Sequence, residues 1–385
     1  MNHSTFPDPF ESARQQKGVG NMVDQDDPVM MILRLKDVRK TAHNWQTFQS
    51  GAQPGRIVVP SEVKIRETRQ IPFEVDPPQH GAYRKLMEAW FRRPLEAAYQ
   101  AALKEILVQE IRSAGAKESV EVVEELALRI QSRALTLLLN IDPAEAETWI
   151  GWGTHVFRSE DDPLDGSKAA ILYDYIDAQI EQAIAQPGEE LYSVLLDAEI
   201  EGRKLTKEEV KGVMILTFAG GRDTVINALT NTIAYLADHP QALQQLRKQP
   251  EITGRAVEEL IRYFSPLTQM GRVVTEDAAV CAHAAKADTR VSLCWASANR
   301  DETVFDQPNE VQLDRKINPH VGFGFSHHKC LGATHARQVL KTLLEVLIAD
   351  IDRIEIDRAE ENIEEWGEFQ RKVGFHHLQA RFYLK

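Results

Sequence analysis

Cys330 stands in a segment whose pattern suits a metal-binding thiolate. The segment reads FGFSHHKCLG over residues 323–332, and a helix with apolar periodicity is predicted directly after it, over Leu331–Ala349. The free N–H groups and positive dipole end of a helix N-terminus lower the pKa of a thiol, and we expect this for Cys330. A thiolate held in this way is a good iron ligand. The alternative is a buried structural cysteine, the role we assign to Cys281 and Cys294.

An acid and an alcohol, Asp223 and Thr224, follow a pair of glycines inside a predicted long helix. The segment reads AGGRDT over residues 219–224. Two adjacent glycines inside a helix cost about 1 kcal/mol each relative to alanine, so a flat cofactor or a local kink should compensate. Asp223 and Thr224 beside such an opening are the parts of a proton relay. The alternative is a glycine pair that packs helices together, with a solvated aspartate.

Glu259 and Arg262 lie three residues apart and therefore share a face of the helix predicted over Thr253–Tyr263. Most such pairs are exposed and contribute only about 0.2–0.5 kcal/mol to stability. Their sequence pattern alone does not separate a surface pair from a buried one.

Four further side chains could hold a dianionic group. His80 and Arg84 are four residues apart and lie on one helical face, while Arg272 and His328 come later in the chain. Cations and N–H donors form strong, charge-assisted hydrogen bonds with carboxylates. Each residue alone is more often solvated or structural.

These segments together resemble the cytochrome P450 family. Residues 323–332 resemble its haem-binding loop FGxGxHxCxG, with Ser326 where the family usually has a second glycine, and residues 219–224 resemble its (A/G)GxDT oxygen-activation motif. Residues 259–262 match ExxR, and DPPQHGAYR over residues 76–84 resembles the DPPxHxxxR segment. The resemblance extends from about Asp76 to the C-terminus. Since serine tolerates positive φ poorly, Ser326 could tighten the loop slightly.

The resemblance implies a mainly α fold, the cytochrome P450 fold, in which residues 1–385 form one helical haem domain with a small β-rich region. It implies haem b, with Cys330 as the axial ligand of the iron. Thr224 would hydrogen-bond dioxygen, and Asp223 would help to supply protons. Arg315 would complete a buried Glu259–Arg262 pair that has a structural role. The expected haem contacts are His80, Arg84, Gly220, Arg272, Phe323, His328, Cys330 and Gly332.

The implied activity is insertion of one oxygen atom of O2 into a small organic substrate, by hydroxylation or oxidative O-demethylation. Electrons should come from a separate ferredoxin with its reductase, or from a flavodoxin, because the sequence after Cys330 is too short for a fused reductase domain. A basic patch on the expected proximal face could steer such a partner. Its members would be Lys85, Arg92, Arg93, Lys329, Arg337 and Lys341.

By the same resemblance, the substrate pocket is lined from residues 45–73, 149–157, 215–220, 267–271 and 369–373. These segments contain the polar residues Arg56, Gln269, Gln370 and Arg371. A pocket with extra hydrogen-bonding groups suits small oxygenated ligands, so we expect a compact polar substrate such as a methoxylated sugar or aromatic compound. The alternative is that these side chains face solvent.

Three other functions stay open. A peroxygenase of the same fold would use peroxide without an electron partner, although Asp223 and Thr224 argue against it. A non-catalytic haem sensor would consume reducing equivalents without forming product. A helical interaction protein without haem would be colourless.

The elements that must position these residues are mainly helical. Besides the two helices above, apolar periodicity predicts helices over Leu95–Arg112, Val120–Leu139, Tyr173–Ala185 and Lys207–Asp238. The last should begin with a capping box formed by Thr206 and Glu209. Short strands are predicted over Val29–Leu33, Arg290–Trp295 and Leu378–Leu384, and the chain from Trp295 to Cys330 should be mostly irregular.

The amino-acid composition argues against several classes of protein. The 385 residues carry 45 lysines and arginines against 58 aspartates and glutamates, a net charge of -13, which argues against non-specific binding to nucleic acid or anionic membranes. No apolar run approaches the roughly 20 residues that span a bilayer, so we expect a cytoplasmic protein without a membrane anchor. Three cysteines are too few for an iron–sulfur cluster with four thiolates.

Overall fold

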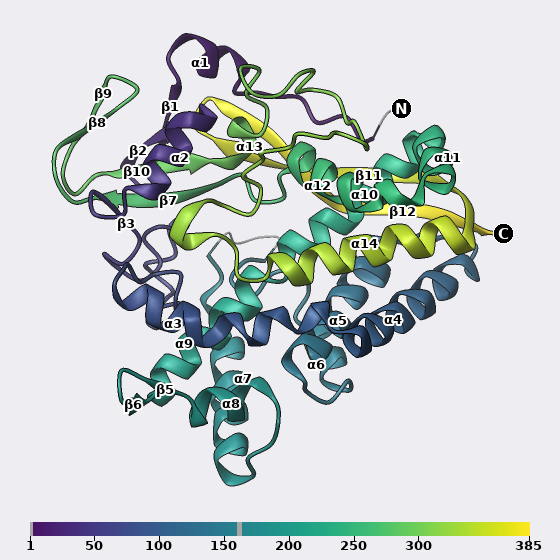
Figure 1. The fold of residues 1–385 in the computed structure, drawn as a ribbon, viewed down its shortest axis with the longest axis horizontal. Coiled ribbons are helices and arrows are strands. Elements are labelled where there is room, and N and C mark those ends of the chain that lie inside the picture. Colours follow the sequence, from purple (N-terminus) through teal and green to yellow (C-terminus); the bar gives the residue numbers. More distant parts are fainter. Residues whose placement is uncertain (1–2, 160–163) are drawn as a thin grey trace.

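The computed structural model describes residues 3–159 and 164–385. Helices form most of it, with a small β-rich region at one end and a long C-terminal hairpin (Figure 1). This agrees with the mainly α fold expected from the sequence. In the part of the chain that is described, no helix is both long and apolar enough to cross a membrane.

The helices follow in chain order. They are α1 (Glu11–Gln16), α2 (Leu35–His43), α3 (Gln79–Glu88), α4 (Ala97–Gly115), α5 (Leu128–Leu139), α6 (Glu145–Gly151), α7 (Gly166–Ala185), α8 (Leu191–Asp197), α9 (Lys207–Gly220), α10 (Asp223–Asp238), α11 (Pro240–Lys248), α12 (Thr253–Phe264), α13 (Trp295–Ala298) and α14 (Ala333–Asp350). Short helical turns cover Trp90–Leu95, Val123–Ala127, Pro250–Ile252 and Ser326–His328.

The strands form several small sheets. They are β1 (Val19–Asp24), β2 (Asp27–Ile32), β3 (Phe48–Gln49), β4 (Val120–Glu121), β5 (Glu199–Ile200), β6 (Arg203–Lys204), β7 (Gln269–Val274), β8 (Ala278–Val280), β9 (His283–Ala285), β10 (Arg290–Cys294), β11 (Ile351–Trp366) and β12 (Phe369–Leu384). One sheet has the order β1-β2-β10-β7-β3, in which β10 runs parallel to β2 and antiparallel to β7. A second has the order β11-β12-β4.

Helix α10 lies inside the main hydrophobic core. It packs against α12, α14 and the β11–β12 hairpin, and most of its side chains are buried. Helix α14 buries an apolar stripe that includes Val339, Leu343 and Leu347, as the i, i+4 spacing requires. The loop that precedes α14 is therefore held at a fixed distance from α10.

The predicted helix over Lys207–Asp238 is divided in two. The Thr206–Glu209 capping box is present as predicted, but α9 ends at Gly220 and α10 begins at Asp223. Between them, Arg222 has φ -104° and ψ -83°, and its Nε donates to the Gly153 carbonyl oxygen at 2.8 Å. The glycine pair thus lies at a break in the helix. A local kink was one of the two compensations expected for the energetic cost of two adjacent glycines.

Other predicted boundaries shift for identifiable reasons. The helix predicted over Val120–Leu139 begins only at Val123, because Val120 and Glu121 pair with β12. It starts with the helical turn Val123–Ala127 and continues as α5 from Leu128. The final predicted strand is the end of β12, a strand that starts at Phe369, and its partner β11 was not predicted. The remaining predicted helices and strands are present with ends moved by up to seven residues, the largest shift being the start of α7 at Gly166 instead of Tyr173.

Candidate active site

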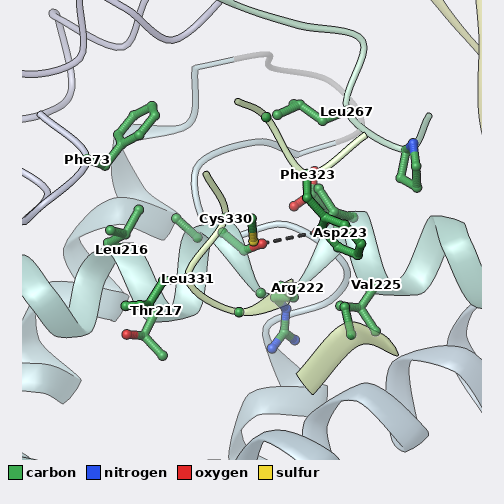
Figure 2. Close-up of a pocket in the computed structure, with 18 of the residues that line it drawn as sticks. Phe73, Leu216, Thr217, Arg222, Asp223, Val225, Leu267, Phe323, Cys330 and Leu331 are labelled. Carbon is green, nitrogen blue, oxygen red and sulfur yellow. Dashed lines mark hydrogen bonds between the residues drawn. The ribbon is translucent and has the colours of Figure 1, made fainter. Parts of the chain in front are cut away.

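One cavity of about 350 Å³ brings the predicted site residues together, a size typical of small-molecule sites. Four separate parts of the chain contribute these residues: α3, the junction of α9 and α10, β7, and the loop before α14. The cavity is lined by His80, Arg84, Gly220, Asp223, Thr224, Arg272, Phe323, His328, Cys330 and Gly332. Figure 2 shows Cys330 and Phe323 together with Leu216 and Asp223 around this cavity.

The loop before α14 presents the Cys330 side chain to the cavity. Its turn is held by backbone hydrogen bonds from Cys330 N to the Phe323 carbonyl oxygen at 2.7 Å, from Gly324 N to the Val321 carbonyl oxygen at 2.9 Å and from Lys329 N to the Ser326 carbonyl oxygen at 3.1 Å. Gly324 has φ +71°, a left-handed conformation that suits glycine. Helix α14 begins at Ala333, with Gly332 at its N-cap, so Cys330 precedes the helix by three residues.

The break between α9 and α10 presents Asp223 and Thr224. Thr224 Oγ1 donates to the Gly220 carbonyl oxygen at 3.1 Å, spanning the break. Asp223 Oδ2 lies 3.8 Å from Nδ1 of His155, a residue that also lines the cavity. An acid and an alcohol therefore lie side by side at the cavity wall.

The four predicted anion-binding side chains line the cavity from three parts of the chain: α3, β7 and the loop before α14. The rings of His80 and His328 lie 4.4 Å apart between centroids, and His328 Nε2 lies 3.7 Å from Asp76. Arg84 donates to the Lys329 carbonyl oxygen and, at 3.2 Å, to Glu88. Burial lowers the pKa of His80 to about 3 and that of His328 to about 4, so both rings are neutral at neutral pH.

Arg272 is a buried cation whose charge is not matched by a carboxylate. It is 3% exposed, and within the described residues no carboxylate oxygen lies at ion-pair distance from its guanidinium. Burial lowers its pKa to about 10, although Asp76 acts in the opposite direction. An unpaired buried charge is costly, which points to an anionic group that belongs in this cavity.

Glu259 and Arg262 form a fully buried ion pair away from the cavity lining. Arg262 Nη2 lies 2.8 Å from Glu259 Oε1, and Arg315 Nε lies 2.9 Å from Glu259 Oε2. Arg262 also donates to the carbonyl oxygens of Asn299 and Pro308. The three charged residues thus fasten the irregular segment before Cys330 to α12, the arrangement that the resemblance implied.

Comparison with known proteins gives a family for this arrangement. Residues 167–369, just over half of the chain, match the family model described as cytochrome P450. The chain belongs to the cytochrome P450 family. It is therefore a haem-thiolate monooxygenase by class, and the cofactor of the family is haem b with an axial cysteine thiolate.

Individual P450 relatives cover nearly the whole chain. A solved structure described as a carbohydrate-active P450 is 68% identical, covers 100% of both chains and has a TM-score of 0.98. Linalool 8-monooxygenase from Pseudomonas putida is 29% identical over 84% of this chain and 83% of its own. Erythromycin C-12 hydroxylase from Saccharopolyspora erythraea is 29% identical over 91% of this chain and 88% of its own.

The cavity of this P450 fits a haem. Its Cys330 sulfur faces the interior, and the buried Arg272 lacks the anion that a haem propionate would supply. The rings of His80 and His328 offer N–H donors for the same carboxylates. The donor set therefore matches a flat dianionic group bound through a thiolate.

One expectation for Cys330 is wrong. The start of a helix was expected to lower its thiol pKa, yet in the P450 chain desolvation raises that pKa, although the side chain is exposed to the cavity. The Gly332 N–H and the charges of Arg84, Arg337 and Lys329 act in the lowering direction but are outweighed. Because helix α14 starts three residues later than Cys330, its dipole is also farther away than the sequence suggested.

Ser326, the one departure from the P450 haem-loop motif, adopts a left-handed conformation that glycine would adopt more easily. Its φ is +60°, and its Oγ lies 2.9 Å from Nδ1 of His43 on α2. The left-handed backbone costs a non-glycine residue about 1–2 kcal/mol, and the hydrogen bond offsets part of this.

The predicted polar lining of the P450 pocket is also wrong, because none of the four proposed polar residues lines the cavity. Arg56 pairs with Asp288 at 2.7 Å. Gln370 donates to Glu365 at 2.9 Å, within the β11–β12 hairpin. The remaining two side chains serve the surrounding structure as well: Gln269 accepts from Ser292, and Arg371 donates to Thr268 Oγ1 at 2.9 Å.

Other ionisable side chains do line the cavity, among them Glu62, His155 and Arg158. Glu62 and His155 lie within segments expected to border the pocket, and Arg158 is one residue beyond one of them. The presence of charged residues within or next to these segments was the only sequence feature that could have indicated an ionisable cavity lining. Four of the five predicted segments line the cavity, whereas residues 369–373 do not, and the side chains that turn inward were not predicted.

The predicted basic patch is partly neutralised. Arg337 pairs with Glu258 at 2.6 Å, and Lys341 lies 3.6 Å from Glu345. Arg93 donates to the Leu138 carbonyl oxygen at 3.0 Å. Three members of the patch are exposed and form no ion pair with the described residues: Lys85, Arg92 and Lys329.

Proposed function

We propose that this P450 inserts one oxygen atom of O2 into a compact carbohydrate, by hydroxylation or by oxidative O-demethylation of a methoxy group. The carrying observation is the 68% identity, over the full length of both chains, with a structure described as a carbohydrate-active P450. The polar side chains Glu62 and Arg158 in the cavity support a substrate with hydroxyl groups.

Cys330 is the proposed axial ligand of the haem iron, since its sulfur faces the cavity. His80, Arg84, Arg272 and His328 would bind the propionates. When bound, the haem activates dioxygen for transfer of one oxygen atom to the substrate. The protein holds the substrate and excludes bulk water from the cavity.

Asp223 and Thr224 are the proposed proton-delivering residues. The Thr224 hydroxyl is held at the helix break by Gly220, where it can exchange this hydrogen bond for one to a ligand in the cavity. The Asp223 carboxylate lies beside this hydroxyl in the chain and near His155, and can pass protons inward from the His155 side.

Electrons would come from a separate ferredoxin with its reductase, or from a flavodoxin. Lys85, Arg92 and Lys329 are the exposed cations that could steer an acidic partner. Turnover should fall with rising salt and with charge reversal at Arg92. Turnover that is insensitive to both would contradict this docking surface.

The test uses the purified holoenzyme and mono-O-methyl ethers of common hexoses, one ether for each hydroxyl position. Binding is followed by the shift in haem spin state, and turnover is measured with a surrogate ferredoxin, its reductase and NADH. Formaldehyde release identifies O-demethylation, whereas a hydroxylated sugar without formaldehyde identifies hydroxylation. Absence of both products from the whole panel would contradict the carbohydrate assignment.

Two controls separate this function from its alternatives. Turnover with hydrogen peroxide alone, at the rate of the complete electron-transfer system, would indicate a peroxygenase. NADH consumption without any product, for every ligand that shifts the spin state, would indicate a sensor.

A further inference from the structure

Glu62 and Arg158 line the cavity without belonging to any motif of the haem site. Glu62 lies in the segment between β3 and α3, and Arg158 lies in the segment after α6. We call these two side chains the polar wall. Apolar residues such as Phe73, Leu216 and Leu267 line the same cavity (Figure 2).

Glu62 is buried without sufficient hydrogen-bonding partners. It is 5% exposed, and its Oε2 accepts no hydrogen bond even though Arg66 Nη2 lies 3.0 Å away. Burial raises the pKa of this carboxyl, with Arg66 and Arg158 acting in the opposite direction. A buried carboxylate oxygen without a donor is destabilising, so such a group in a cavity is suited to a ligand that donates to it.

Arg66 does not meet this need, because its Nη2 is shared with a second carboxylate and its Nε and Nη1 donate to none of the described groups. Arg66 Nη2 lies 3.2 Å from Glu74 Oε1, and both of these side chains are fully buried. Glu74 also accepts from the backbone N–H groups of Gly55 and Gln70. The Arg66–Glu74 pair therefore fixes the segment that carries Glu62, while the Glu62 carboxylate keeps free acceptor capacity.

Arg158 offers the complementary donors. In the described parts of the chain, its guanidinium forms neither a hydrogen bond nor an ion pair, although its charge acts to lower the pKa of both Glu62 and Glu364. A guanidinium presents up to five N–H donors in a fixed plane. Beside a carboxylate that needs donors, it completes a wall able both to accept and to donate.

We propose that Glu62 and Arg158 determine substrate specificity by binding hydroxyl groups of the substrate. This deepens the carbohydrate assignment and rests on it. A hydroxyl group donates to Glu62 and accepts from Arg158, whereas an apolar ligand of equal size would leave the buried Glu62 and the half-buried Arg158 without partners. Sites built to bind hydroxyl groups discriminate strongly against analogues that lack them. With the hydroxyls held at the polar wall, a methoxy or C–H group of the sugar is left to the apolar walls.

The experiment compares holoenzymes of wild type, Glu62→Leu, Arg158→Met and the double variant. Each is titrated with the mono-O-methyl hexose that wild type binds most tightly, using the spin-state shift. Loss of a charge-assisted hydrogen bond should raise Kd by roughly tenfold to a hundredfold in each single variant. KM should rise in parallel, and kcat at saturation should change much less, since neither residue is proposed to act in the chemical step.

Controls remove effects of folding and of charge alone. Glu62→Gln keeps an acceptor for a hydroxyl and should lie between wild type and Glu62→Leu. Glu345→Leu and Arg358→Met make matched changes at exposed positions and should leave Kd unchanged. Imidazole, which binds the haem iron directly, should bind all variants that keep an intact haem site with the wild-type Kd.

Binding of an apolar ligand tests the role of the polar wall independently of the proposed carbohydrate function. The double variant should bind a monoterpene such as linalool at least roughly tenfold more tightly than wild type, because the ligand no longer covers a buried carboxylate and a half-buried guanidinium. Suppose that wild type binds no sugar but the double variant binds the terpene more tightly than wild type does. The carbohydrate function is then contradicted, whereas the inference that the polar wall disfavours apolar ligands is supported. Unchanged sugar and terpene affinities in the double variant would overturn the inference.

Discussion

Thr224 donates its hydroxyl hydrogen to the carbonyl oxygen of Gly220, four residues earlier, at 3.1 Å. This bond crosses the point where α9 ends and α10 begins. The hydroxyl thus donates to a carbonyl oxygen at the end of α9, and this hydrogen bond holds the hydroxyl at the cavity wall. A hydrogen bond at the edge of a cavity is easily exchanged for one to a ligand, as a proton-delivering group requires.

Thr224→Ala should therefore separate electron consumption from product formation. We expect the haem spectrum and substrate Kd of wild type, with most of the NADH consumed yielding reduced oxygen instead of product. Product, NADH and peroxide are quantified in the same assay. Thr232→Ala is the matched control, since Thr232 makes the same kind of bond, to Ala228 at 2.7 Å, without lining the cavity. Wild-type coupling in Thr224→Ala would exclude the proposed role.

The buried pair of Glu259 and Arg262 should dominate the stability of the haem-side core. Arg262→Ala leaves a buried carboxylate only partly compensated by Arg315, and loss of one partner of such a pair costs about 3–5 kcal/mol. Urea unfolding, followed by tryptophan fluorescence and haem absorbance, measures this loss. Lys341→Ala breaks an exposed pair and should change the free energy of unfolding by less than about 1 kcal/mol. Equal effects of the two substitutions would contradict the structural role.

His335 should make stability depend on pH. It is buried against Tyr99, whose hydroxyl lies 2.9 Å from Nδ1, and burial lowers its pKa to about 4 from the ordinary 6.5. Between these values the unfolded chain binds more protons, so stability falls as pH decreases from about 6.5 towards 4, by up to about 3 kcal/mol. His335→Gln should reduce the slope of this dependence in urea unfolding from neutral pH to about pH 5, leaving the contributions of His80 and His328. An identical slope for wild type and variant would show that His335 does not carry it.

The sequence was most informative where function depends on residues close together in the chain. The loop of residues 323–332 and the Asp223–Thr224 pair are local patterns, and the cavity collects them. The helix break was suggested by the cost of two glycines, but its position also depends on Arg222, which binds carbonyl groups of a distant loop. Such a long-range contact has no local signature.

The predictions from sequence failed mainly for the orientation of side chains and for the pairing of strands far apart in the chain. Strand β11 reads IDRIEIDRAEENIEEW, and its many exposed charges hide a strand that is defined by pairing with β12. Arg371 lies in a segment expected to border the pocket, yet its side chain turns towards Thr268. The thiol pKa of Cys330 was misjudged because desolvation, which outweighs the Gly332 N–H and the nearby positive charges, depends on distant parts of the chain.

The central claim, that the Cys330 thiolate is the iron ligand, is tested most directly by the spectrum of the reduced protein with carbon monoxide. Wild type, Cys281→Ala and Cys294→Ala should all show the long-wavelength Soret band of thiolate ligation. Cys330→Ala should lose that band, either with the haem itself or by a shift to the shorter wavelength of other ligands. A Cys330→Ala protein that retains its haem and the long-wavelength band would contradict the assignment.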